Sequence, residues 1–98
     1  MNSSPSEDVR LDVWLWRARF FKTRALASSH ICSKGIRLTR HGATRKVDKP
    51  GTRLQPGDTL TFMRGNSLLN IEFVSPGERR GPADEAQALY RVASESEN

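Results

Sequence analysis

The residues with the clearest chemical meaning in this sequence are its lysines and arginines, because clustered cations bind phosphates. The chain has 98 residues, with 16 Lys and Arg against 11 Asp and Glu, and a formal net charge of +5. Twelve of these cations lie between Arg10 and Arg53, where Asp12 and Asp48 are the only acids, so this segment carries a charge of +10. The remainder, with four basic and nine acidic residues, carries −5. This segregation predicts a protein that binds a polyanion, most often a nucleic acid.

The basic residues alternate with a patterned set of apolar residues, so we expect them on one face of a folded unit; a solvated basic face is the alternative. RNA duplexes are recognised mainly by shape, through phosphates and 2′-hydroxyls, which requires several cations at fixed positions. The candidate RNA-contacting residues are Arg10, Arg17, Arg19, Lys22, Thr23, Arg24, Lys34, Arg37, Arg40, Arg45, Lys46 and Lys49.

Several of these candidates also have structural interpretations. Thr23 is a suitable N-cap for a helix, Arg24 can pair with Asp12, and Lys34 can complement the C-terminal end of a helix. Packing on Trp or Phe rings is the alternative for Arg10, Arg17 and Arg19.

The aromatic residues of the same segment divide in a similar way. Trp14 shares a helical stripe with apolar residues and is expected in the core. Trp16 and Phe21 lie outside that stripe, and an exposed aromatic ring among cations is suited to stacking on an unpaired base.

The sequence lacks the residue constellations that catalysis or metal binding requires. His30 and His41 are the only histidines, and neither lies in a nucleophile or metal motif. The single cysteine, Cys32, cannot form an intramolecular disulfide, and we expect it to be a small buried residue of a helix. Lack of disulfides and of any membrane-length apolar run fits the cytoplasm. We therefore expect a cytoplasmic, non-enzymatic monomer without metal or cofactor.

The hydrophobic periodicity predicts two helices followed by strands. Leu11, Trp14, Leu15 and Ala18 form one helical stripe. A second helix is expected over residues 24–33, with Thr23 as its N-cap and its end at Gly35. The residues expected on its apolar side are Leu26, Ala27, His30 and Ile31.

After residue 35 the hydrophobic period changes toward two, which predicts strands over 36–40, 45–48, 59–64 and 68–74. His41-Gly42 and Gly65-Asn66 mark turns, and the last two strands form an antiparallel hairpin. A short helix with Pro82 at its first position follows. The predicted fold class is α+β, with a disordered leader (1–9), a folded domain (10–75) and a C-terminal segment with a short helix (76–98).

The segment from Arg10 to Phe62 resembles the S4 RNA-binding domain, also called the αL motif. The residues that match the family's pattern are Arg10-Leu11-Asp12, Leu15, Thr23-Arg24, Ala27, Ile31, Gly35-Ile36 and Leu54-x-x-Gly57-Asp58-x-Leu60. Leu11-Asp12-x-Trp14-Leu15-Trp16, Lys22-Thr23-Arg24 and the tail 78–90 resemble, more narrowly, the ribosome-associated heat-shock proteins of the 15-kDa class.

This resemblance implies a fold of two helices packed on a small antiparallel sheet, and binding to structured ribosomal RNA. For the heat-shock class it also implies association with free large ribosomal subunits that carry a stalled nascent chain attached to tRNA. The sequence departs from the family at residues 39–44, where we expect a longer loop that leaves the register of Arg40 open. Arg17 is a second departure, because the heat-shock class more often has a small residue there.

Two other functions remain open at this point. The first is a general binder of structured RNA or tRNA without ribosomal specificity. The second is a regulatory adaptor that binds another protein through its acidic tail and the Trp16 surface. DNA binding through a helix–turn–helix is disfavoured because the second helix leads directly into a strand.

Overall fold

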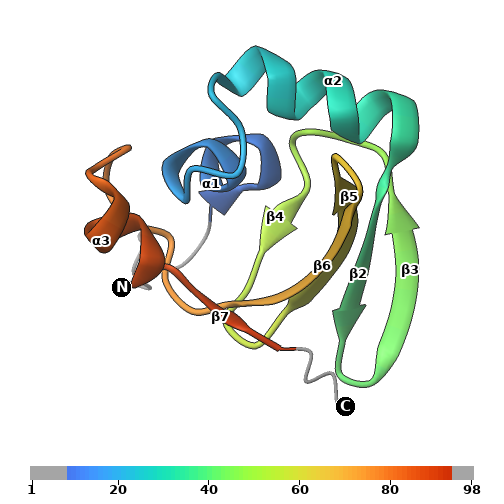
Figure 1. Cartoon of the computed structure of the whole chain (residues 1–98). Coiled ribbons are helices and arrows are strands. Elements are labelled where there is room, and N and C mark those ends of the chain that lie inside the picture. The colour runs from blue at the N-terminus through green and yellow to red at the C-terminus, as the bar shows by residue number, and fades with distance from the viewer. Residues whose placement is uncertain (1–8, 94–98) are drawn as a thin grey trace.

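The computed structural model describes residues 9–93, and within them a curved five-stranded antiparallel sheet with helices packed against it (Figure 1). The sheet order is β3-β2-β5-β6-β7, and a separate two-stranded sheet pairs β1 with β4. This arrangement confirms the predicted α+β class. The helices are α1 (Leu11–Arg17), α2 (Arg24–Lys34) and α3 (Ala83–Gln87). The strands are β1 (Val9–Arg10), β2 (Ile36–Arg40), β3 (Ala43–Val47), β4 (Arg53–Leu54), β5 (Thr59–Arg64), β6 (Ser67–Phe73) and β7 (Tyr90–Val92).

Both ends of α2 form as the sequence predicts. The Thr23 hydroxyl accepts a hydrogen bond of 3.0 Å from the backbone N–H of Leu26, which satisfies one of the free donors of the first turn. At the other end, the N–H of Gly35 donates to the carbonyls of His30 and Ile31. Gly35 has φ 77° and ψ 169°, a conformation that is almost restricted to glycine. The chain can therefore leave α2 and enter β2 without a connecting loop.

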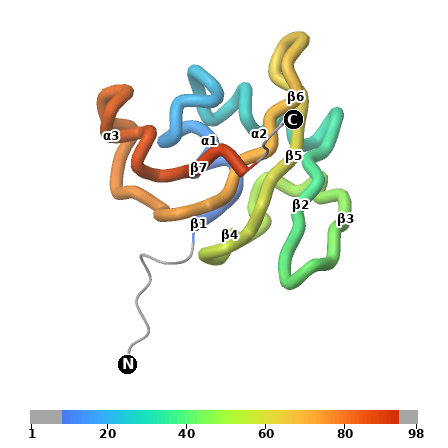
Figure 2. The backbone as a smooth tube through the Cα atoms, turned by 60° about the horizontal axis from the view of Figure 1, so that its bottom comes forward, coloured from blue at the N-terminus to red at the C-terminus, as the bar shows by residue number. Residues whose placement is uncertain are grey.

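The turn between β2 and β3 corrects the expectation of a longer loop over residues 39–44. Arg40 pairs with Ala43 and Thr39 pairs with Thr44, so only His41 and Gly42 lie outside the ladder. Both have positive φ, 54° and 80°, as a tight type I′ turn requires. The extra residues lengthen the two strands, and the hairpin extends beyond the body of the sheet (Figure 2).

The core is built around Trp14, which is fully buried and has its ring edge against Phe73 at 5.2 Å between centroids. Its indole N–H donates to the Ser75 carbonyl at 2.8 Å. Val9 also belongs to this core, since it is 7% exposed and pairs with Leu54, so the predicted leader is wrong at this residue. The rest of that leader, residues 1–8, lies outside the described residues.

Two assignments on α2 are wrong. Leu26, predicted on the apolar side of the helix, is 51% exposed, and Cys32, predicted to be buried, is exposed. Ala27 and Ile31 are the fully buried residues of α2, and Ser28 and His30 are partly buried beside them. Most other residues of α2 are small or polar, so the hydrophobic pattern does not define which face of the helix is buried.

The segment after residue 75 returns to the sheet. Pro82 is the N-cap of α3 rather than its first residue, and α3 spans little more than one turn. The chain then forms β7, a strand that the sequence analysis missed, which pairs with β6 so that Tyr90 lies opposite Phe73. Among the described residues, no helix has the length and apolar character needed to cross a membrane.

Candidate nucleic-acid interface

The predicted cations separate into those that the fold uses internally and those that it leaves exposed. Arg40 belongs to the first group. Its guanidinium donates to both carboxylate oxygens of Asp58, at 2.8 and 2.7 Å, and to the Arg53 carbonyl at 3.0 Å. Asp58 is 1% exposed and also accepts from the Gln55 N–H, which closes the turn before β5. The structure therefore assigns Arg40, predicted as an RNA contact, to the neutralisation of a buried acid.

Arg17 and Arg19 are also engaged with the protein itself. The Arg17 guanidinium donates to the carbonyls of Pro76 and Gly77, at 3.2 and 2.9 Å. The Arg19 Nε donates to the Gly81 carbonyl at 2.6 Å. These bonds attach the segment after β6 to α1. Both arginines are therefore held by backbone carbonyls of a loop about 60 residues later in the sequence, and not by packing on aromatic rings. The spacing of residues in the sequence gives no signal for such contacts.

Asp12 organises a second cluster, at the start of α1 and α2. Its side chain is 3% exposed and lies 3.1 Å from Arg10 and 3.6 Å from Arg24, and it also accepts a hydrogen bond from the Ser28 hydroxyl. Burial acts to raise the pKa of Asp12, but the hydrogen bonds from Arg10 and Ser28 and the positive charges of Arg10 and Arg24 outweigh it and hold that pKa below its ordinary value. The two arginines remain about half exposed, so each has donors left for a phosphate.

Thr23 and Lys22 lie beside this cluster. The Thr23 hydroxyl accepts the capping hydrogen bond, which confirms its structural interpretation, and the exposed Lys22 precedes it. Free N–H groups at a helix N-terminus favour anions. This end of α2 therefore combines Lys22, Arg10 and Arg24 in one place.

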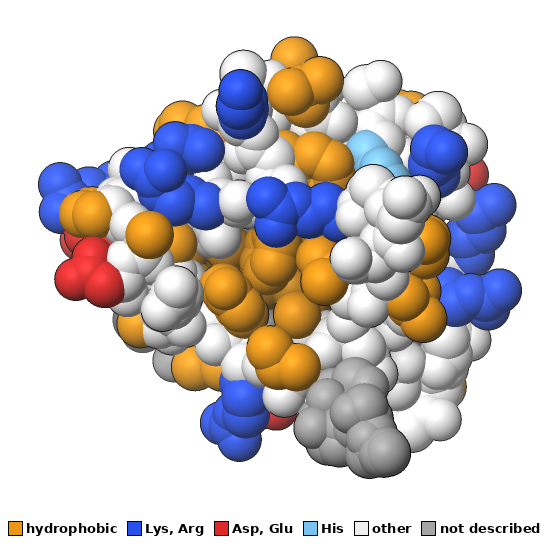
Figure 3. Space-filling model, in the orientation of Figure 1, with side chains coloured by type: hydrophobic (Ala, Val, Ile, Leu, Met, Phe, Trp, Pro, Cys, Tyr) orange, Lys and Arg blue, Asp and Glu red, His pale blue; other side chains and the backbone are white. Residues whose placement is uncertain are grey.

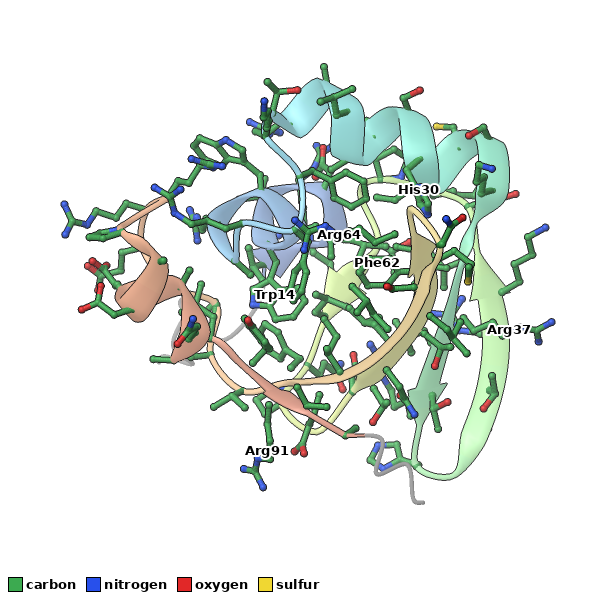
Figure 4. All side chains as sticks on the ribbon, viewed as in Figure 1. Trp14, His30, Arg37, Phe62, Arg64 and Arg91 are labelled. Carbon is green, nitrogen blue, oxygen red and sulfur yellow. The ribbon has the colours of Figure 1, made fainter. Side chains whose placement is uncertain are left out.

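The C-terminal end of α2 carries the other concentration of positive charge. Lys34, Arg37 and Lys46 line a hollow of about 260 Å³ between α2, the β2–β3 hairpin and the tip of the β5–β6 hairpin. Arg37 points outward from the sheet (Figure 4). The stem of Lys46 lies on Gly35, so close that a Cβ at that position would come within 2.5 Å of the Lys46 Cε. Glycine at the end of α2 therefore also fixes where this lysine lies.

Arg45 and Lys49 complete the exposed set. Arg45 lies on β3, an edge strand of the sheet, and Lys49 follows in the loop toward β4. In the face shown in Figure 3, Lys and Arg side chains lie along the β2–β3 edge at the right, across the centre, and beside the acidic side chains at α3. Within residues 9–93, the predicted cations that are exposed and form neither an ion pair nor a side-chain hydrogen bond are Lys22, Lys34, Arg37, Arg45, Lys46 and Lys49.

The aromatic residues near these cations are packed together. Phe21 and His30 both lie against Phe62, with ring centroids 6.2 and 6.0 Å from it, so Phe21 is a half-buried packing residue rather than a free stacking surface. Burial, and secondarily the charge of Lys34, lowers the pKa of His30. Trp16 is half-buried, and its carbonyl accepts a hydrogen bond from Arg80 of the C-terminal segment.

Three residues near the cations were not among the predicted contacts. Met63 and Leu68 lie opposite each other on β5 and β6, are 45% and 66% exposed, and line the hollow beside Lys34. Arg64, the last residue of β5, is also exposed. No local sequence pattern indicates that α2 ends beside Met63, because that contact depends on how the helix packs on the sheet. Over residues 9–93, no group of three or more His, Cys, Asp or Glu side chains is arranged to hold a metal ion.

The known proteins that this chain resembles in sequence and in structure belong to one family. No protein-family model matches the chain. Heat shock protein 15 of Escherichia coli K12 is 40% identical over 96 residues, which cover 98% of this chain and 68% of that protein. The heat shock protein 15 homolog of Haemophilus influenzae is 37% identical over 90 residues, which cover 92% of this chain and 65% of the homolog.

A solved structure agrees with these relatives. The trimeric structure of Vibrio cholerae heat shock protein 15 matches this fold with a TM-score of 0.76 at 35% identity, covering 90% of this chain and 84% of that one. The sequence matches and this fold confirm the resemblance drawn from the motifs. The chain belongs to the heat shock protein 15 family, a member of the S4 domain class.

Proposed function

We propose that this protein is a non-catalytic RNA-binding protein that binds structured ribosomal RNA. Its site would be on free large ribosomal subunits that carry a stalled nascent chain, during rescue of blocked subunits. The observation that carries this proposal is the set of six exposed predicted cations that form neither an ion pair nor a side-chain hydrogen bond within residues 9–93. Two further arginines, Arg10 and Arg24, share one buried carboxylate and keep about half of their surface exposed.

These exposed cations contribute little to the stability of the fold. An exposed charge contributes about 0–1 kcal/mol to stability even when it is paired. Accumulating like charges on one side of a small domain costs stability through repulsion, which phosphates would relieve. Phosphate contacts dominate the affinity of nucleic-acid complexes, so the surface is chemically suited to this ligand.

The ribosomal part of the proposal is supported by family membership and by the resemblance of the motifs to the ribosome-associated heat-shock class. A general binder of structured RNA or tRNA would use the same cations. The two functions differ in where the protein is found in the cell, not in its surface chemistry.

Sedimentation through a sucrose gradient of cell extract at moderate salt separates these possibilities. The test variant is Arg37→Glu/Arg45→Glu, in which both residues are exposed and form no ion pair among the described residues. The control is Arg79→Glu/Arg91→Glu, which makes the same charge change outside the basic segment. These arginines pair with Glu85 and Glu72, but their side chains are 68% and 69% exposed, so little stability depends on the pairs. Arg24 is avoided, because a glutamate there would lie beside the buried Asp12.

We expect the natural protein and the control to co-migrate with free large subunits, and the test variant to remain at the top of the gradient. Migration at the top by the natural protein, with RNA binding retained in a purified assay, would favour the general RNA binder. Loss of RNA binding in both assays would refute the proposal and favour a protein-binding adaptor.

A further inference from the structure

The hollow at the C-terminal end of α2 combines three kinds of surface that a simple phosphate site does not need. Lys34, Arg37 and Lys46 lie at its rim, Met63 and Leu68 form an apolar wall, and the space between them is about 260 Å³. Behind this wall, His30 and Phe62 lie side by side beneath α2 (Figure 4). We call this hollow the rim pocket.

The charge of the rim pocket is uniformly positive. Its lining contains no Asp or Glu, and among the described residues its three cations form no ion pair. Arg37 and Lys46 are direct cross-strand neighbours, a like-charge arrangement that is unfavourable in the absence of an anion. The rim therefore favours a ligand with negative charge.

The apolar wall indicates that the ligand also has an apolar surface. Met63 and Leu68 are directly opposed in the β5–β6 ladder and are 45% and 66% exposed. They alternate with Phe62 and Leu69, which face the core, so the strand period places them on the opposite side of the sheet. A single exposed apolar residue is ordinary, but this pair forms a continuous surface beside three cations. A bare phosphate would gain nothing from it.

We propose that the rim pocket binds one unpaired nucleotide that is extruded from structured RNA. The base would lie against Met63 and Leu68, and its own and flanking phosphates would contact Lys34, Arg37 and Lys46. A paired duplex keeps its base faces stacked and cannot offer this combination. An unpaired base costs less to extrude than a paired one, and this difference selects bulges and loops. This inference rests on the proposed function, and it adds that the RNA must contain an unpaired nucleotide.

The test compares two short RNA duplexes that differ by a single bulged nucleotide, here 2-aminopurine, whose fluorescence reports unstacking. A third duplex carries an abasic bulge, which keeps the extra phosphate but removes the base. The protein variant is Met63→Ser/Leu68→Ser. Leu26→Ser is the control, because Leu26 is 51% exposed and does not line the pocket. Circular dichroism checks that each variant is folded.

We expect the natural protein to bind the bulged duplex roughly 10-fold more tightly than the paired or abasic duplex, as burial of roughly 55 Å² of apolar surface between one base and the two side chains allows. The double serine variant should lose this preference yet keep its affinity for the paired duplex, and Leu26→Ser should keep both. Equal affinity for all three duplexes would overturn the inference while leaving RNA binding intact. A preference that survives in Met63→Ser/Leu68→Ser would also overturn it. Failure to bind any duplex would refute RNA binding itself.

Discussion

Replacing Arg40 with alanine should destabilise the protein while leaving the RNA affinity of the folded fraction largely unchanged. The substitution removes three hydrogen bonds, two of them to Asp58, which is 1% exposed and keeps the hydrogen bond from the Gln55 N–H. Removing one member of a buried ion pair typically costs about 3–5 kcal/mol, because the other charge stays buried without compensation.

The cost here should be smaller than for a fully buried pair. The Arg40 side chain is 27% exposed, so water can enter and partly replace the guanidinium. We therefore expect a loss of about 2–3 kcal/mol in the free energy of unfolding. For a domain of this size, 1 kcal/mol corresponds to roughly 4–8 °C, so Tm should fall by roughly 10–20 °C.

Thermal and urea unfolding of Arg40→Ala and Arg37→Ala provide the assay. The two arginines lie on the same strand three residues apart, but Arg37 is exposed and has no ion-pair partner within residues 9–93. Arg37→Ala should therefore change stability by less than about 0.5 kcal/mol and weaken RNA binding. A double-mutant cycle with Asp58→Ala isolates the pair. If Arg40→Ala unfolds like the natural protein but loses RNA affinity, Arg40 contacts RNA and is not a structural residue.

Four further outcomes are expected. Thr23→Ala should cost about 1 kcal/mol of stability through loss of the helix cap, measurable by urea unfolding. Gly35→Ala should cost about 1–3 kcal/mol, because its φ and ψ are restricted to glycine, and should displace Lys46 as well, which NMR shifts of that side chain would show. The logarithm of RNA affinity should fall with log salt concentration with a slope of roughly −4 to −5 if about six cations contact phosphates, and a slope near zero in a titration would contradict the interface. The pKa of His30 is lowered in the folded state, so the unfolded state binds the proton more readily, and the contribution of His30 to stability should be complete above about pH 6.5 and fall below it. In His30→Gln, the midpoint of urea denaturation should depend less on pH below about 6.5. The same pH dependence in the variant and the natural protein would contradict this prediction.

The alternation of inward and outward residues in β2 distinguishes structural arginines from exposed ones, whereas charge alone does not. In β2, Ile36 and Leu38 alternate inward, and Arg40 is next in that series. An arginine at an inward position requires a buried acceptor, and Asp58 supplies it. Arg37 occupies the outward series, so the period of two alone separates a structural arginine from an exposed one. Charge alone groups both residues as candidate RNA contacts.

Other parts of the fold could not be derived from local patterns. The positions of Arg17 and Arg19 depend on a loop about 60 residues later, whose carbonyls accept their hydrogen bonds. Strand β7 has three residues and forms only because β6 offers an unpaired edge. The helices, the β5–β6 hairpin and the caps at Thr23 and Gly35 were predictable, because each depends on neighbours in the sequence.

The division between structural and exposed cations determines which experiments can locate an interface. Arg17, Arg19 and Arg40 hold segments together, so their substitution would reduce RNA binding by unfolding the protein even if none of them touched RNA. Lys34 and Lys46 have no such role in the described fold apart from the packing of the Lys46 stem on Gly35. A loss of affinity caused by Lys34→Ala at unchanged Tm would therefore report contact with RNA directly. A loss of binding that accompanies a lowered Tm in an Arg40 variant would carry no such information.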